Sequence, residues 1–203
     1  MQSLTLLHNQ ALDATGKVVA GIGPDQWGAP TPCEDWDVRA LANHIVSGNL
    51  WAAELATGKT IDEVGDRLDG DVLGSDPARA YTQSAAAAAA AFEAPGALDA
   101  PCAVSYGPVP GSVYAGHRFI DVLVHGWDLA FATGQQTTLD PELVEGCIEV
   151  IEPQSAALRA SGQFGDGGAI PKNADNQTRL LTMLGRRPTP ISERAGLIAR
   201  HFW

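Results

Sequence analysis

The sequence contains few cysteines, and none of them forms a pair with the spacing of a metal or redox motif. Cys33, Cys102 and Cys147 are the only three in 203 residues, and no C-x-x-C pair occurs. An odd number of widely spaced cysteines indicates neither a disulfide framework nor a zinc site made of thiolates. We therefore expect the thiols to be reduced.

Basic residues are also scarce. Lysine and arginine together number 13, against 24 aspartates and glutamates, so the formal net charge is −11 at pH 7. No basic cluster offsets this charge, and an acidic surface repels phosphate backbones. Nucleic acid is therefore excluded as an expected partner.

Long hydrophobic runs are absent as well. No stretch reaches the roughly 18 consecutive apolar residues of a membrane-spanning helix, and residues 1–16 lack a basic segment followed by an apolar one. We expect a cytoplasmic protein without a membrane partner. Hydrophobic residues nonetheless make up 45% of the chain, which predicts one globular domain over residues 1–203 with a full-sized core.

Apolar residues recur at spacings of three and four through most of the chain, which is typical of amphipathic helices. Two predicted helices begin after a capping aspartate, Asp37 and Asp76, and the second has Pro77 at its first position. No convincing strand pattern appears, and we assign residues 100–111 no regular structure. The sequence therefore predicts an all-α, bundle-like fold. The predicted helices cover residues 3–22, 38–57, 77–94, 112–133, 141–160, 175–184 and 191–203, with 59–75 and 161–174 as long loops.

A line of polar residues runs along the predicted helix over residues 112–133. Spacings of four, four and three place these residues on one face of an otherwise apolar helix. Buried polar groups cost several kcal/mol unless they are hydrogen-bonded, ion-paired or bound to a metal. Asp121 and His125 can direct a carboxylate oxygen and an imidazole nitrogen at one cation, or they can form a buried ion pair. The line consists of His117, Asp121, His125 and Asp128.

A third metal ligand has to come from another helix. His44 is the candidate, because it lies mid-helix beside an apolar stripe, whereas His8 and His201 are less well placed. Spacing alone leaves open whether His44 is a ligand or a core histidine bonded to a carbonyl. For His117 and Asp128 we favour a structural role over that of groups that orient the ligands.

Two imidazoles and one carboxylate leave at least one coordination position open, as in catalytic rather than structural sites. The same ligand set describes the facial triad of non-haem iron oxygenases, which sit in β-rich folds and so fit less well here.

Two segments resemble a known family. Thr31 to His44 is similar to the second-helix signature of the DinB/YfiT-like superfamily, and within it to the N-terminal domain of mycothiol-dependent maleylpyruvate isomerase. Asp121 to Gly134 resembles the helix that carries the remaining ligands in that group. Asp71 to Pro77, and Arg179 to Pro188, are similar to an actinobacterial branch of uncharacterised metal-binding proteins.

This resemblance implies a DinB-like four-helix bundle, here with additional short C-terminal helices. It also implies a divalent metal, zinc or nickel, held by one histidine and an [Asp/Glu]-x-x-x-His pattern, which map to His44, Asp121 and His125. The chain departs from the isomerase in two ways. Its acid is Asp121 rather than the usual glutamate, and no C-terminal domain of comparable length follows Leu139.

Taken together, the residues and the resemblance lead to an expected function. It is a metal-dependent enzyme that uses a low-molecular-weight thiol such as mycothiol, in a thiol transfer or an isomerisation of an organic substrate. The alternatives are a hydrolase that uses a metal-bound water, and a metal-binding stress or interaction protein without turnover. We expect residues 59–75 and 161–174 to influence substrate choice, and a homodimer is also expected.

Overall fold

The computed structural model describes residues 2–33, 35–154, 170 and 172–186. These residues fall into two compact units, with the boundary between Cys147 and Ile148. The prediction of one domain over residues 1–203 stays a prediction. Among the described residues, none of the helices has the length and hydropathy needed to span a lipid bilayer.

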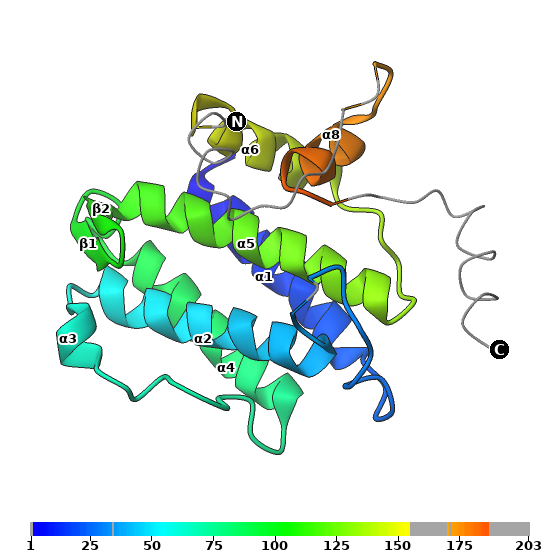
Figure 1. Ribbon diagram of the computed structural model, residues 1–203. Helices are drawn as coiled ribbons and strands as arrows, with labels where there is room; N and C mark the ends of the chain where they lie inside the picture. Colours follow the sequence, from blue (N-terminus) through cyan, green and yellow to red (C-terminus); the bar gives the residue numbers. More distant parts are fainter. Residues whose placement is uncertain (1, 34, 155–169, 171, 187–203) are drawn as a thin grey trace, which may run out of the picture. The chain divides into compact units, whose positions relative to one another are not determined.

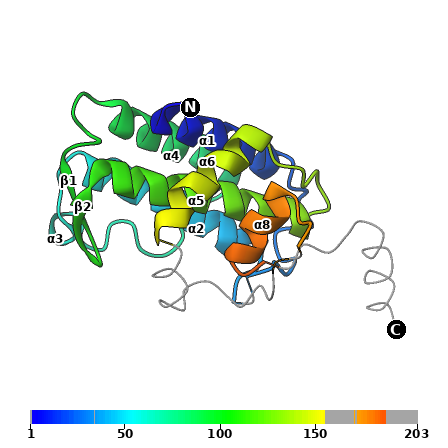
Figure 2. The same cartoon turned by 90° about the horizontal axis from the view of Figure 1, so that it is seen from above.

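Four long helices form the core of the first unit: α1 (Leu4–Ala20), α2 (Val38–Ala56), α4 (Pro77–Glu93) and α5 (Gly111–Ala132). α1 packs against α4 and α5, and α2 packs against the same two helices (Figures 1 and 2). The predicted helical bundle is confirmed.

Side-chain caps explain where α2 and α4 begin. The Asp37 carboxylate accepts from the backbone N–H of Ala40, and the Asp76 carboxylate accepts from that of Arg79. Each bond satisfies a backbone donor that has no partner within the helix, and the predicted caps of α2 and α4 are confirmed.

α5 is the most buried of the four helices. Phe119, Val122 and Leu129 are fully buried along it. Its contact with α1 is close: the Thr15 hydroxyl donates to the Val122 carbonyl at 2.9 Å, and a Cβ atom at Gly126 would overlap the Thr15 side chain. This packing fixes α5, which carries most of the candidate site.

The interpretation of residues 100–111 as lacking regular structure was wrong. β1 (Pro101–Val104) and β2 (Gly107–Pro110) form a short antiparallel hairpin in which Cys102 lies opposite Val109. Strands of four residues with three prolines among them are too short and too irregular to show the alternation that predicts a strand. The hairpin buries Cys102 against a cluster that includes residues of α2 and α4.

The predicted loop at residues 59–75 contains one short helix, α3 (Ile61–Val64). It is held by a capping box between Thr60 and Glu63 and ends at Gly65, where φ is +63°. The remainder, residues 66–75, contains neither helix nor strand, as expected.

Three further helical segments follow α5. α6 (Pro141–Ile151) is succeeded by a 3₁₀ turn, η1 (Glu152–Gln154), so the α-helix predicted to run to residue 160 ends earlier. α8 (Asn176–Met183) begins directly after Asp175, the first residue of the helix predicted over 175–184, and the Asp175 carboxylate caps it by accepting from Thr178 N–H. The helix predicted at 191–203, His201 and most of the 161–174 stretch lie outside the described residues.

Candidate metal site

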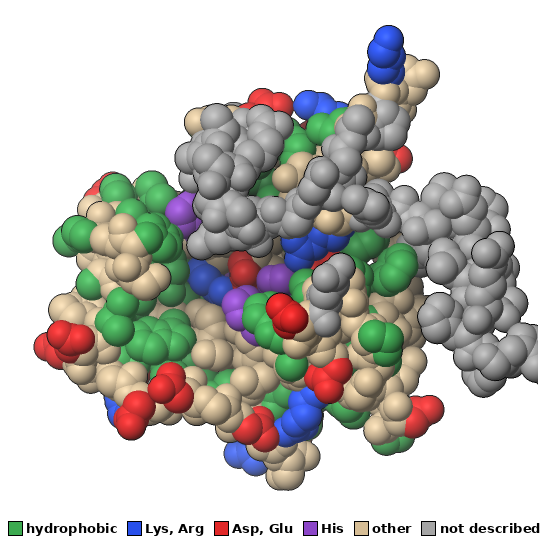
Figure 3. Space-filling view, in the orientation of Figure 1, with side chains coloured by type: hydrophobic (Ala, Val, Ile, Leu, Met, Phe, Trp, Pro, Cys, Tyr) green, Lys and Arg blue, Asp and Glu red, His purple; other side chains and the backbone are tan. Residues whose placement is uncertain are grey.

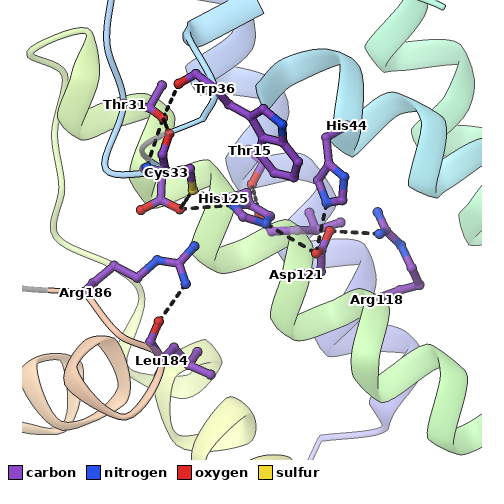
Figure 4. A network of polar contacts seen from close by, with 12 residues as sticks. Thr15, Thr31, Cys33, Trp36, His44, Arg118, Asp121, His125, Leu184 and Arg186 are labelled. Carbon is purple, nitrogen blue, oxygen red and sulfur yellow. Dashed lines mark hydrogen bonds and ion pairs between the residues drawn. The ribbon is translucent and has the colours of Figure 1, made fainter. Parts of the chain in front are cut away.

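α2 and α5 bring the three predicted metal ligands together. His44 lies on α2, and Asp121 and His125 lie one turn apart on α5. The Nε2 atom of His44 is 3.3 Å from Oδ1 of Asp121, and Nε2 of His125 is 3.4 Å from the same oxygen. Figure 4 shows the two rings and the carboxylate pointing toward one another. We call these three residues the first cluster.

The separations within the first cluster suit a tetrahedral cation. Bonds of about 2.0–2.1 Å from zinc to nitrogen or oxygen place two ligands roughly 3.3 Å apart. The side chains of His44, Asp121 and His125 are 35%, 26% and 13% exposed, so solvent can reach the cluster. Figure 3 shows histidine side chains beside acidic and basic ones on this face. The donors fit a divalent cation, and metal ligation by these residues stays a prediction.

Arg118 holds the second oxygen of the Asp121 carboxylate. Its Nη1 donates to Asp121 Oδ2 at 2.8 Å, and its Nη2 donates to Asn49 Oδ1 at 3.0 Å. The arginine is buried, and a Cβ atom at Gly48 would overlap its guanidinium. Asp121 therefore keeps only Oδ1 directed at the two histidines.

Trp36 restricts the ring of His44. The two rings stack with centroids 4.6 Å apart and planes inclined by 28°, and His44 meets His125 edge to face at 5.0 Å. Trp36 belongs to the turn before α2, where the Thr31 hydroxyl donates to the Trp36 carbonyl at 2.7 Å. The turn thus keeps the His44 ring directed at the first cluster.

A second group of polar atoms lies at the other ring nitrogen of His125. Nδ1 of His125 is 3.0 Å from Oδ2 of Asp128, whose side chain is completely buried. The Cys33 thiol donates to the same carboxylate oxygen at 3.5 Å, and its Sγ is 3.8 Å from Nδ1. Asp128 therefore orients the His125 ring, which gives it a role beyond simple packing.

The electrostatics of the first cluster follow from these contacts. Burial by itself raises the pKa of Asp121, but Arg118 and His125 hold it well below its ordinary value. Burial by itself lowers the pKa of His125, but the Asp121 carboxylate and the hydrogen bond to Asp128 raise it well above its ordinary value. Without a cation, His125 is an imidazolium paired with an ionised Asp121. A metal has to displace that proton.

Two other histidines are not part of the first cluster. His117 lies two turns before His125 on α5, and its Nδ1 is 2.6 Å from the hydroxyl of Tyr106 in the hairpin turn. His8 is fully buried on α1, in edge contact with Phe92. Burial, with a smaller contribution from Arg118, lowers the pKa of His8 to about 4, so this ring is neutral at pH 7.

Sequence reasoning missed Cys33, Trp36 and Arg118. Arg118 lies three residues before Asp121 on the same helix, so i,i+3 spacing was a signal that could have revealed the ion pair. Cys33 and Trp36 lie in a turn without periodicity, and Cys33 reaches a histidine 92 residues later. No local pattern predicts such a contact.

The fold and the first cluster define a class, a DinB/YfiT-like helical bundle with a candidate metal site between two of its helices. The chain belongs to the mycothiol maleylpyruvate isomerase N-terminal domain family, which matches residues 8–130. The resemblance seen in the sequence is thereby confirmed.

Two relatives and one solved structure are also similar to the chain. Uncharacterised proteins from two strains of Mycobacterium tuberculosis are each 37% identical to the chain over 186 residues, which is 89% of this chain and 96% of the relative. A crystal structure of a histidine-to-alanine mutant of mycothiol-dependent maleylpyruvate isomerase matches with a TM-score of 0.55 and 15% identity. It covers 79% of this chain and 68% of that one, and at this identity the match shows a shared fold.

Proposed function

We propose that this protein is a metal-dependent enzyme that uses a low-molecular-weight thiol such as mycothiol, in a thiol transfer or an isomerisation of an organic substrate. The observation that carries the proposal is the convergence of His44 Nε2, Asp121 Oδ1 and His125 Nε2 on a side that solvent can reach. Membership of the mycothiol maleylpyruvate isomerase N-terminal domain family supports the choice of thiol. The proposed cation is zinc, with nickel as the alternative.

A divalent cation bound here would stabilise the thiolate form of a coordinated thiol and so supply a nucleophile at neutral pH. The protein's own residues prepare the site for it. Arg118 keeps Asp121 ionised and turns one oxygen toward the histidines. Asp128 and Trp36 fix the orientations of the His125 and His44 rings. The half-buried indole of Trp36, which stacks on His44, also offers apolar surface to an organic substrate.

The same residues support two alternative functions. Water at the open position would make the protein a hydrolase of esters or amides. Without any turnover, the cluster would serve a metal-binding stress or interaction protein. These alternatives differ from the main proposal in whether a thiol binds and in whether any substrate is converted, so one set of measurements separates them.

Titration of the cobalt-loaded protein with mycothiol tests the proposal. The Cys33→Ser variant provides the background, because it removes the protein's own nearby thiol as a source of signal. We expect a sulfur-to-cobalt charge-transfer band on addition of mycothiol, and none with S-methylated mycothiol or with His125→Ala protein. If the band never appears in cobalt-loaded protein, the thiol proposal fails. Conversion of esters or amides without thiol would then identify the hydrolase.

A further inference from the structure

A second set of metal-ligating atoms lies on the opposite edge of the His125 ring. Cys33 Sγ lies 3.8 Å from His125 Nδ1 and 3.5 Å from Asp128 Oδ2, and the last two atoms are 3.0 Å apart. A tetrahedral cation with bonds of about 2.3 Å to sulfur and 2.0 Å to nitrogen or oxygen would place its ligands roughly 3.3–3.6 Å apart. The separations in this second cluster are close to these values, with the Sγ–Nδ1 distance somewhat longer and the Nδ1–Oδ2 distance somewhat shorter.

The second cluster is held in position by the fold. Asp128 is fully buried on α5 one turn from His125, so its carboxylate has a fixed direction. Cys33 is fixed by the turn before α2, where its backbone N–H donates to the Thr31 hydroxyl at 3.1 Å. Figure 4 shows the sulfur directed at the edge of the His125 ring away from Asp121. Two elements far apart in the sequence thus bring the three donors together.

The two clusters differ in the cations they prefer. The first offers two imidazoles and a carboxylate, whereas the second contains a sulfur ligand. Thiolates bind soft cations such as Cd²⁺ more strongly than imidazole and carboxylate do. Binding converts the Cys33 thiol to a thiolate and releases its proton to solvent.

The clusters also compete, because they share His125. A neutral imidazole offers one lone pair to a cation, since the other ring nitrogen carries the proton. With Nε2 facing the first cluster, Nδ1–H donates to Asp128 at 3.0 Å. With Nδ1 turned to a cation in the second cluster, Nε2–H faces Asp121 Oδ1 at 3.4 Å. Each tautomer has a carboxylate ready to accept its proton.

We propose that the second cluster is a separate site for soft, thiophilic cations, and that its occupation excludes a cation from the first cluster. The second cluster and the site of the proposed function both use His125, so cations at the two clusters should compete for it. It requires neither His44 nor a low-molecular-weight thiol, and the two proposals can therefore fail independently.

Protection of Cys33 by Cd²⁺ tests this site in the metal-free full-length chain. Iodoacetamide labels accessible thiols, and peptide mass spectrometry identifies them; Cys102 and Cys147 are fully buried and serve as internal references. We expect Cd²⁺ to protect Cys33 in the wild type and equally in His44→Ala. Asp128→Asn keeps the shape of the side chain but is expected to raise the Cd²⁺ concentration for half-protection by roughly tenfold or more.

Native mass spectrometry of the wild-type chain tests the competition. With Cd²⁺ and Zn²⁺ supplied together, we expect chains that hold one cation or the other. Chains that hold both cations, loss of protection in His44→Ala, or unchanged protection in Asp128→Asn would each overturn the inference. Zn²⁺ binding that depends on His44, with Cys33 left unprotected by Cd²⁺, would overturn this inference alone. Protection of Cys33 in a chain that binds no Zn²⁺ would overturn the proposed function alone.

Discussion

Asp121 has two carboxylate oxygens with different partners, and this division decides how it can bind a cation. Arg118 occupies Oδ2, while Oδ1 faces the rings of His44 and His125. The carboxylate is therefore prepared as a ligand through one oxygen. Arg118 contributes the positioning without touching the place where a cation would lie.

Arg118→Ala is expected to weaken Zn²⁺ binding by roughly 10- to 100-fold, the usual effect of losing an outer partner of a ligand. It should also lower the free energy of unfolding by about 1–3 kcal/mol, because Asp121 and Asn49 each lose a hydrogen-bond partner. Isothermal titration calorimetry and urea denaturation measure the two effects. Arg79→Ala removes an exposed arginine of α4 and should change neither. Wild-type affinity in Arg118→Ala would contradict the positioning role.

The metal-free protein is expected to lose stability as the pH rises above neutrality. The pKa of His125 is raised well above 6.5 by Asp121, so the folded state holds this proton more tightly than the unfolded chain does. The stabilisation of the folded state by this proton is complete below pH 6.5 and is lost as the pH rises through the raised pKa of His125. Urea denaturation from pH 6 to pH 9 should show this decline, and a shallower one in His125→Gln. Parallel pH profiles of the two proteins would rule out the ion pair as its source.

At the scale of the helices, α2 makes room for the arginine on α5. Gly48 lies where any Cβ atom would overlap the Arg118 guanidinium. Gly48→Ala is therefore expected to push the guanidinium away from Asp121 and weaken Zn²⁺ binding. The free energy of unfolding should change by less than about 1 kcal/mol, because the greater helix preference of alanine over glycine offsets the cost of the displaced guanidinium. A variant that is more stable and binds Zn²⁺ normally would show that α2 does not constrain Arg118.

α1 contributes a different polar residue to the core. Neither ring nitrogen of His8 has a hydrogen-bond partner among the described residues, and burial lowers its pKa to about 4. The unfolded chain takes up this proton near 6.5, so stability is lost as the pH falls from 6.5 toward 4. His8→Leu should reduce the loss of unfolding free energy between pH 7 and pH 5 by about 2 kcal/mol. Chemical denaturation at both pH values measures this loss. An unchanged loss in His8→Leu would contradict the attribution of the pH dependence to His8.

The sequence predicted the helices far better than the contacts between them. Helical periodicity and capping aspartates located α2, α4 and α5 to within a few residues, because those signals are local. The same periodicity placed Asp121 and His125 on one face. The approach of His44 rested on the family resemblance, since spacing alone left it open. Cys33 and Trp36 act through a turn whose position depends on tertiary packing, which no local pattern encodes.

Over the whole molecule, the charge distribution favours cations. The formal net charge is −11, so the protein as a whole attracts metal ions and repels phosphate groups. The first cluster adds candidate ligands to this general attraction, on a bundle that belongs to the mycothiol maleylpyruvate isomerase N-terminal domain family. The central claim is therefore that the whole protein binds one divalent cation through these ligands.

Zn²⁺ titration calorimetry of four proteins tests that claim most directly. These are the wild type, His44→Ala, His125→Ala and, as a control on the same helix, His117→Ala. His117 contacts Tyr106 rather than the first cluster, so its replacement should leave binding intact. The account predicts one Zn²⁺ per chain in the wild type and His117→Ala, with binding at least roughly 100-fold weaker in the other two. Wild-type stoichiometry and affinity in both His44→Ala and His125→Ala would contradict it.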